Sequence, residues 1–71
     1  MQLSVGEKIN IIMKRMGMTL TELAAATGQT RQNLSNKMSR DNFTEGDMQA
    51  LAKALCCELS IEFQLPDGTI I

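Results

Sequence analysis

The stretch from residue 31 to residue 37 is rich in side chains that donate or accept hydrogen bonds. If Leu34 faces a core, a helix over this stretch has one polar and partly cationic outer face. The chemistry of such a face is recognition through hydrogen bonds. Catalysis is not expected, because the chain lacks histidine and therefore any Ser–His or Cys–His relay. The polar side chains, none of them acidic, are Arg31, Gln32, Asn33, Ser35, Asn36 and Lys37.

The composition is typical of a small binding module. With 71 residues the chain has room for one domain, expected over residues 1–71, and its 44% apolar content is too high for a disordered tail. Two cysteines without histidine are too few for a zinc site or a disulfide framework, so we expect no metal and no cofactor. Without a membrane-length apolar run or a visible secretory signal, the protein is expected to be cytoplasmic. Of Cys56 and Cys57, one is expected to be buried at a helix end, and a redox role for the pair is disfavoured.

Charge is distributed unevenly along the chain. Residues 1–40 carry six basic and two acidic side chains, whereas residues 41–71 carry one basic and six acidic side chains, for a net charge of −1. This asymmetry predicts a basic face on the N-terminal part. The alternative is that two solvated faces differ in charge by chance.

Helix start and stop signals divide the first four-fifths of the chain. Ser4 and Thr19 each precede a glutamate by three residues, which is a capping-box pattern. Thr30 and Thr44 are the N-caps expected for two further helices, and Gly28 is expected to end the second helix in a left-handed conformation. Apolar residues recur at helical spacing after the caps. The helices are therefore predicted at about residues 5–16, 20–27, 31–38 and 45–56.

Beyond residue 57 the apolar period changes from 3.6 to 2. Large apolar residues alternate with polar ones over residues 59–65, which predicts a half-buried strand. The sequence Pro66-Asp67-Gly68 predicts a turn, and residues 69–71 a short return strand. The expected fold class is thus mainly α, a compact four-helix domain with a short C-terminal β-strand or hairpin.

The predicted strand bears on assembly. Two strands alone are marginally stable and leave an open edge. Pairing that edge with the same strand of a second chain would make a four-stranded sheet, bury Ile61, Phe63 or Leu65, and stabilise a small core as a homodimer. The alternative is that the hairpin packs on its own helices and the chain is a monomer.

A short helix, a tight glycine turn and a second short helix over residues 20–37 form a helix-turn-helix pattern. In this pattern Ala24 is small where the two helices cross, and Leu34 anchors the second helix. The segments 21–35 and 47–55 together resemble the phage-repressor/Cro-like (Xre-type) helix-turn-helix family. The resemblance implies a lambda-repressor-like domain that binds double-stranded DNA, usually as a dimer, and acts as a transcription regulator or repressor.

The resemblance also implies roles for individual residues. In the family, residues just after the N-cap of the second helix reach base edges. Arginine can bond guanine and glutamine can bond adenine with paired hydrogen bonds, and a third reader lies one turn further on. The residues implied to contact bases are Arg31, Gln32 and Asn36. Those implied to contact the DNA backbone, which positions the protein without specifying sequence, are Thr30, Asn33, Lys37 and Arg40.

Two departures from the family pattern favour an alternative function. Leu20 stands where the family often has a phosphate-binding glutamine, and Lys37 stands where it prefers an apolar residue. Either Met38 fills the apolar position, or the stem of Lys37 packs there while its charge reaches solvent. The alternative is a protein–protein interaction module, antitoxin-like or an adaptor, whose acidic C-terminal part contacts a protein partner.

Overall fold

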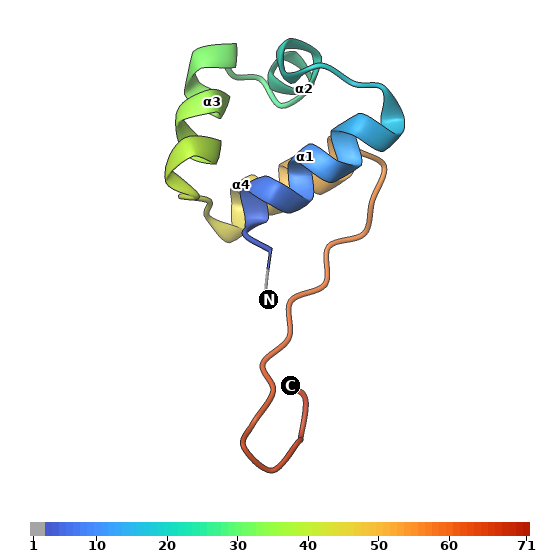
Figure 1. The fold of residues 1–71 in the computed structure, drawn as a ribbon, viewed down its shortest axis with the longest axis vertical. Coiled ribbons are helices and arrows are strands. Elements are labelled where there is room, and N and C mark those ends of the chain that lie inside the picture. Colours follow the sequence, from blue (N-terminus) through green and yellow to red (C-terminus); the bar gives the residue numbers. More distant parts are fainter. Residues whose placement is uncertain (1–2) are drawn as a thin grey trace.

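The four helices all begin at a serine or threonine N-cap. The computed structural model describes residues 3–71, so the first two residues of the expected domain lie outside the described part. Each cap hydroxyl accepts a hydrogen bond from the N–H three residues later, and three of the four caps are full capping boxes. The helices in this range are α1 (Val5–Met16), α2 (Leu20–Ala26), α3 (Arg31–Arg40) and α4 (Glu45–Ala54) (Figure 1).

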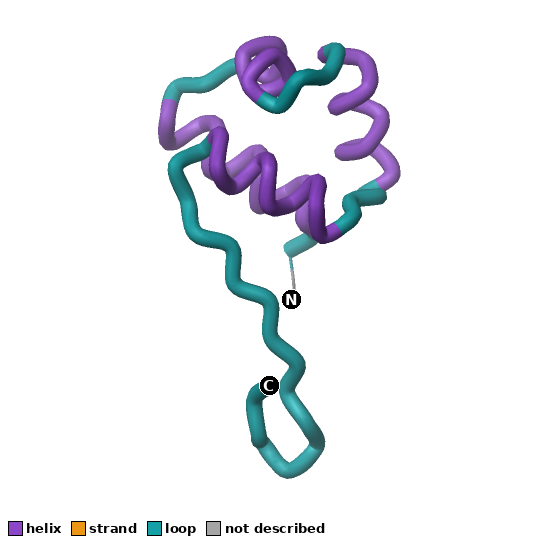
Figure 2. Tube along the Cα trace, turned by 180° about the vertical axis from the view of Figure 1, so that it is seen from behind, coloured by secondary structure: helices purple, strands orange, loops and turns teal. Residues whose placement is uncertain are grey.

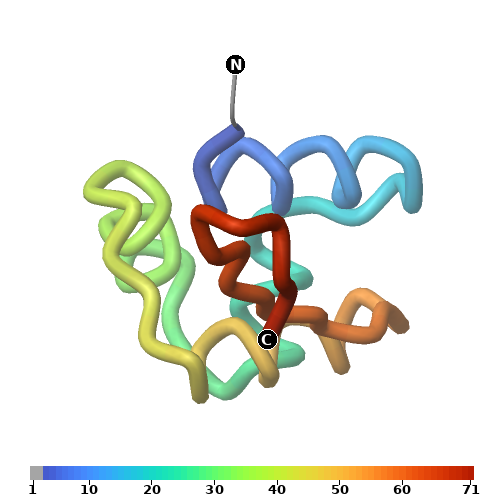
Figure 3. The backbone as a smooth tube through the Cα atoms, turned by 90° about the horizontal axis from the view of Figure 1, so that it is seen from below, coloured from blue at the N-terminus to red at the C-terminus, as the bar shows by residue number. Residues whose placement is uncertain are grey.

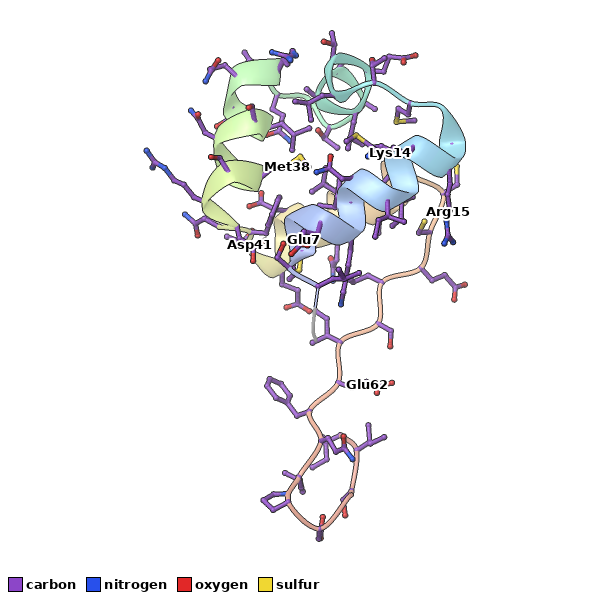
Figure 4. All side chains as sticks on the ribbon, viewed as in Figure 1. Glu7, Lys14, Arg15, Met38, Asp41 and Glu62 are labelled. Atoms are coloured by element: carbon purple, nitrogen blue, oxygen red, sulfur yellow. The ribbon has the colours of Figure 1, made fainter. Side chains whose placement is uncertain are left out.

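The four predicted helices are present: α1 has its predicted bounds, and the other three differ from the prediction at their C-terminal ends. α3 extends to Arg40, two residues beyond the predicted end, because Asp41 adopts the left-handed conformation (φ 50°) and closes the helix as its C-cap. Its carboxylate Oδ1 also accepts a hydrogen bond of 2.9 Å from the N–H of Gly6, in the first turn of α1. The end of α3 is thereby attached to the start of α1, and the two labelled side chains Glu7 and Asp41 lie together there (Figure 4).

The core lies between the four helices, which enclose it in a ring when seen from behind (Figure 2). Leu34 of α3 and Leu23 of α2 are fully buried, and Gly6 of α1 lies against the backbone of α3. Met38 and Leu20 are half-buried and pack against this cluster. The buried apolar residues are Ile9, Met13, Leu23, Ala24, Leu34, Leu51 and Leu55.

The C-terminal segment, residues 58–71, leaves the helices as an extended arm (Figure 1), which Figure 3 shows end-on from below. The arm makes the molecule 42 Å long against 23 Å and 22 Å in the other directions. The predicted strands at 59–65 and 69–71 are wrong for the described chain, which holds an isolated antiparallel bridge between Gln64 and Ile70. The reason is that a strand needs a partner. The N–H of Phe63 and of Leu65 bond to the carbonyls of Ile71 and Thr69, whereas residues 58–62 find no main-chain partner within residues 3–71.

The hairpin does not pack on the helices either. Phe63 is 72% exposed and Ile71 is 74% exposed. The expectation of one buried cysteine is also wrong, since Cys56 and Cys57 are both exposed. Cys56 has a positive φ of 57°, at the point where the chain turns from α4 into the arm. Within the described residues, none of the helices is long and apolar enough to cross a membrane.

Candidate nucleic-acid interface

The orientation of α3 is fixed by its inner face and by the turn before it. Leu34 is 0% exposed and holds the helix to the core. Gly28 has φ 70°, as its predicted left-handed conformation requires, and the N–H of Gln29 returns to the carbonyl of Ala24 at 3.0 Å. Ala24 of α2 is 1% exposed and belongs to the same buried cluster as Leu34. The turn and the leucine together expose the opposite face of α3 to solvent.

The three predicted base-contacting residues lie together on that exposed face. Arg31, Gln32 and Asn36 are all exposed. Gln32 Nε2 donates a hydrogen bond of 3.1 Å to Asn36 Oδ1, one helical turn away. Within residues 3–71, the amide oxygen of Gln32 and the amide NH₂ of Asn36 make no further hydrogen bond. These groups match the acceptor and donor pattern that base edges present in the major groove.

A chain of hydrogen bonds connects the turn to Asn33. Asn33 Nδ2 donates to Gln29 Oε1 at 3.1 Å, and Gln29 Nε2 donates to Thr27 Oγ1 at 2.8 Å. The Thr27 hydroxyl in turn donates to the carbonyl of Leu23 at the end of α2, at 2.9 Å. Asn33 is exposed, and its amide oxygen makes no hydrogen bond within the described residues. Sequence reasoning missed Gln29 and Thr27. The four-residue spacing between Gln29 and Asn33 is the signal that could have found them.

Lys37 and Arg40 differ in how freely they can meet a phosphate. Lys37 Nζ is 3.0 Å from Asp47 Oδ1, and this ion pair connects α3 to α4. The N–H of Thr44, donated to the carboxylate, and the Lys37 ammonium lower the pKa of Asp47. Arg40 is exposed and carries its charge outward. A polar hollow lies between α3 and the start of α4. It is lined by Asn33, Asn36, Lys37, Arg40, Asn42, Thr44 and Asp47.

Thr30 is the last of the residues predicted to contact the DNA backbone, and it is the N-cap of α3. Thr30 is exposed, and its hydroxyl oxygen accepts from the N–H of Asn33 at 3.0 Å, so its O–H proton can still be donated outward. Leu20 and Met38 are both half-buried and pack against the core. The basic residues of α1, Lys14 and Arg15, lie at the end of that helix remote from Asp41 (Figure 4).

The fold and this face define a helix-turn-helix domain of the DNA-binding kind, with α2 and α3 as its two helices. The chain belongs to the family of Cro/C1-type HTH DNA-binding domains, which it matches over residues 8–60. Double-stranded DNA is the partner that this membership supports. No curated protein and no solved structure gave a significant match to the chain.

Proposed function

We propose that this protein is a sequence-specific, cytoplasmic transcription regulator that binds a palindromic operator as a homodimer. The observation that carries the proposal is the outer face of α3. It is exposed, free of acidic residues, and held rigidly by Leu34. Occupancy of the operator would repress transcription by blocking other proteins, or recruit them, without any catalytic step.

In this proposal some residues of α3 contact base edges and others contact the DNA backbone. Arg31 and the hydrogen-bonded pair Gln32–Asn36 contact base edges in the major groove. The DNA backbone is contacted by Thr30, Asn33, Lys37 and Arg40, with Asn33 oriented by Gln29. Lys37 contributes less than Arg40, because its ammonium is already paired with Asp47.

The homodimer forms in this proposal through the arm, with Ile61, Phe63 and Leu65 in the interface. What supports it is the exposure of these side chains, at 48%, 72% and 40%, next to residues 58–62, whose main-chain groups have no partner within residues 3–71. Apolar surface of this kind marks a protein interaction site. A dimer would place two copies of α3 about one DNA turn apart, roughly 34–36 Å.

The experiment that tests the proposal is selection of bound duplexes from a random DNA library at low salt, followed by sequencing. We expect a palindrome with half-sites about one helical turn apart, roughly 10 base pairs. A matched selection with Arg31→Ala should lose the preference at one position of each half-site.

The exposed apolar arm, with its acidic residues, also favours a second candidate function. It is a protein-interaction module on the same scaffold, in which the arm contacts a different protein. Absence of any enriched sequence and of salt-dependent DNA affinity, together with a partner that co-purifies through the arm, would favour this second function.

A further inference from the structure

The turn at the far end of the arm joins an aspartate to a glycine, Asp67-Gly68, away from the four helices (Figure 1). Both residues are exposed, and Gly68 has φ 93°, a left-handed conformation that residues with a side chain rarely adopt. We propose that Asp67-Gly68 is a covalent modification site, where the main chain isomerises through a succinimide to isoaspartate when the hairpin opens. The closed hairpin protects the site, because it holds both reacting groups.

The reaction needs only the groups of this turn and water. The main-chain nitrogen of Gly68, unhindered by a side chain, attacks Cγ of the Asp67 carboxyl group in its neutral form. The Cγ–OH bond breaks, the nitrogen loses its proton, and water leaves as a five-membered succinimide ring closes. A second water molecule then opens the ring at one of its two carbonyls. Opening at the main-chain carbonyl of Asp67 leaves the chain running through the former side chain, which is isoaspartate, and the mass is unchanged.

In the closed turn, hydrogen bonds hold both reacting groups. The N–H of Gly68 donates to the carbonyl of Leu65 at 2.9 Å, so the proton that must leave the nitrogen is bound. The carboxylate Oδ1 of Asp67 accepts from the N–H of Thr69 at 2.9 Å. That N–H lowers the pKa of Asp67, so the neutral carboxyl group that the reaction requires is scarce. Both hydrogen bonds therefore oppose ring closure.

These two hydrogen bonds depend on the short hairpin that surrounds them. The N–H of Leu65 donates to the carbonyl of Thr69 at 2.7 Å, and Phe63 and Ile71 exchange hydrogen bonds of 2.8 and 2.9 Å. The helices do not cover the hairpin, since Phe63 and Ile71 are exposed. A two-stranded hairpin that packs on nothing else is marginally stable in water. The turn therefore opens often, and each opening releases both reacting groups.

Isoaspartate would prevent the hairpin from closing again. It adds one methylene group to the main chain between Asp67 and Gly68, so the spacing of the four-residue turn is lost. The carboxylate moves onto Cα and no longer lies where the N–H of Thr69 can reach it. The buried core of the helices contains no residue beyond Leu55, so it would stay intact. The modification would thus change the arm in one direction and leave the helices as they are.

Incubation of the whole chain at neutral pH tests the proposal. Isoaspartate is measured in the tryptic peptide that follows Lys53, where chromatography separates isomers of equal mass and electron-transfer fragmentation locates the change. The hairpin is opened by urea or by Ile71→Pro, which removes the N–H donated to Phe63 and leaves residues 65–69 as they are. We expect isoaspartate at Asp67 to form about fivefold more slowly in the unmodified chain than in either case, the modest protection of a marginally stable hairpin.

Matched controls assign the effect to the hairpin. Ser60→Pro lies in the segment whose main-chain groups have no partner within residues 3–71, so it should keep the rate of the unmodified chain. Asp67→Glu keeps the charge but cannot form the five-membered ring, so the signal should disappear. Asp41 and Asp47 are followed by residues with side chains and should give much less isoaspartate in the same sample.

Each outcome decides the proposal. Slow formation in the unmodified chain and in Ser60→Pro, with fast formation in urea and in Ile71→Pro, supports it. Absence of isoaspartate in urea overturns the site, and equal rates with and without the hairpin overturn the protection. A rise in Ser60→Pro as large as that in Ile71→Pro overturns it too, because the protection would then come from other contacts of the arm. Circular dichroism shows that the helices of both variants are intact, and no readout depends on DNA binding.

Discussion

The four helices and the arm satisfy the same physical requirements in opposite ways. In the helices, the N-terminal N–H groups have side-chain caps and seven apolar residues are buried within one chain. In the arm, apolar side chains are exposed and residues 58–62 lack main-chain partners within the described chain. The helices thus satisfy these requirements within a single chain, whereas the described part of the arm does not, which is why we propose the arm as an interface. A substitution in one part should therefore leave the other part unaffected.

The largest effect is expected from the core of the helices. Leu34→Ala removes a fully buried side chain and leaves a cavity under α3, at a cost of about 2–5 kcal/mol of unfolding free energy. Ile70→Ala in the arm, at a residue 58% exposed, should change it by less than about 0.5 kcal/mol. Urea unfolding followed by circular dichroism measures both. Equal losses in the two variants would contradict the division between the parts.

The next largest effect is expected on DNA recognition. Arg31→Ala should weaken binding to the selected operator by about 1–3 kcal/mol and relax the preference at one base pair, because the proposed bidentate base contact would be lost. Arg31 lies outside the arm, so the oligomeric state measured by sedimentation should stay the same. Fluorescence anisotropy with the operator and with single-base variants measures the affinity. An equal loss for every sequence would show that Arg31 contacts the backbone instead.

A smaller effect is expected where α3 meets α1. Asp41→Ala removes the hydrogen bond from the N–H of Gly6 and places alanine at φ 50°, for a cost of about 1 kcal/mol. Asp41→Asn keeps an oxygen acceptor and tolerates the left-handed conformation, so it should lose much less. Thermal unfolding compares the two. If both variants lose the same unfolding free energy, then it is the negative charge of Asp41 that stabilises the fold, through its interaction with the first turn of α1.

The structure of the helices could be predicted from the sequence, whereas that of the arm could not. The caps at Ser4, Thr19, Thr30 and Thr44 are local signals, since a hydroxyl and an N–H three residues away interact wherever the helix packs. The four helices and the buried Leu34 could therefore be predicted. The exposure of Arg31, Gln32 and Asn36 followed in the same way from their position opposite the leucine.

The features that sequence reasoning missed depend on contacts between elements. The attachment of Asp41 to Gly6 joins residues 35 positions apart, and the Lys37–Asp47 ion pair joins two helices. Neither distance can be derived from local spacing. The predicted strand is wrong for a related reason. The alternation over residues 59–65 correctly indicates an extended chain, but a strand also requires a partner, and the described chain offers none to residues 58–62.

The ion pair leads to a prediction about salt dependence. Arg40→Ala should reduce the slope of log K against log salt concentration by about one. The reason is that the proposed phosphate contact of Arg40 would be lost, so that fewer counterions would be released on binding. Lys37→Ala/Asp47→Asn removes both charges of the pair and should leave the slope nearly unchanged. Lys37→Ala alone should weaken binding to every sequence, since Asp47 then faces the DNA without its partner. A loss of about one in the slope for the double variant would show that Lys37 leaves Asp47 to bind a phosphate.

The smallest effect is expected on the pH dependence of stability, which should differ between the helices and the arm. The N–H of Thr44 and then the Lys37 ammonium lower the pKa of Asp47, and the N–H of Thr69 lowers the pKa of Asp67 in the arm. A carboxyl group with a lowered pKa in the folded state stabilises that state above its ordinary pKa. This contribution is lost as the pH falls through the lowered value. Stability of the helices should therefore decline below about pH 4, which is near the ordinary pKa of aspartate.

Two matched variants assign this decline. Asp47→Asn cannot titrate, so unfolding of its helices should show a shallower loss between neutral and acidic pH than the unmodified chain does. Asp67→Asn should leave the decline unchanged, because its carboxylate bonds within the turn of the arm and not to any helix. Urea unfolding at a series of pH values, with a helix signal as the readout, measures both. If Asp67→Asn also flattened the profile, the arm would have to be packed on the helices in solution, and the hairpin could not be free to pair with a second copy.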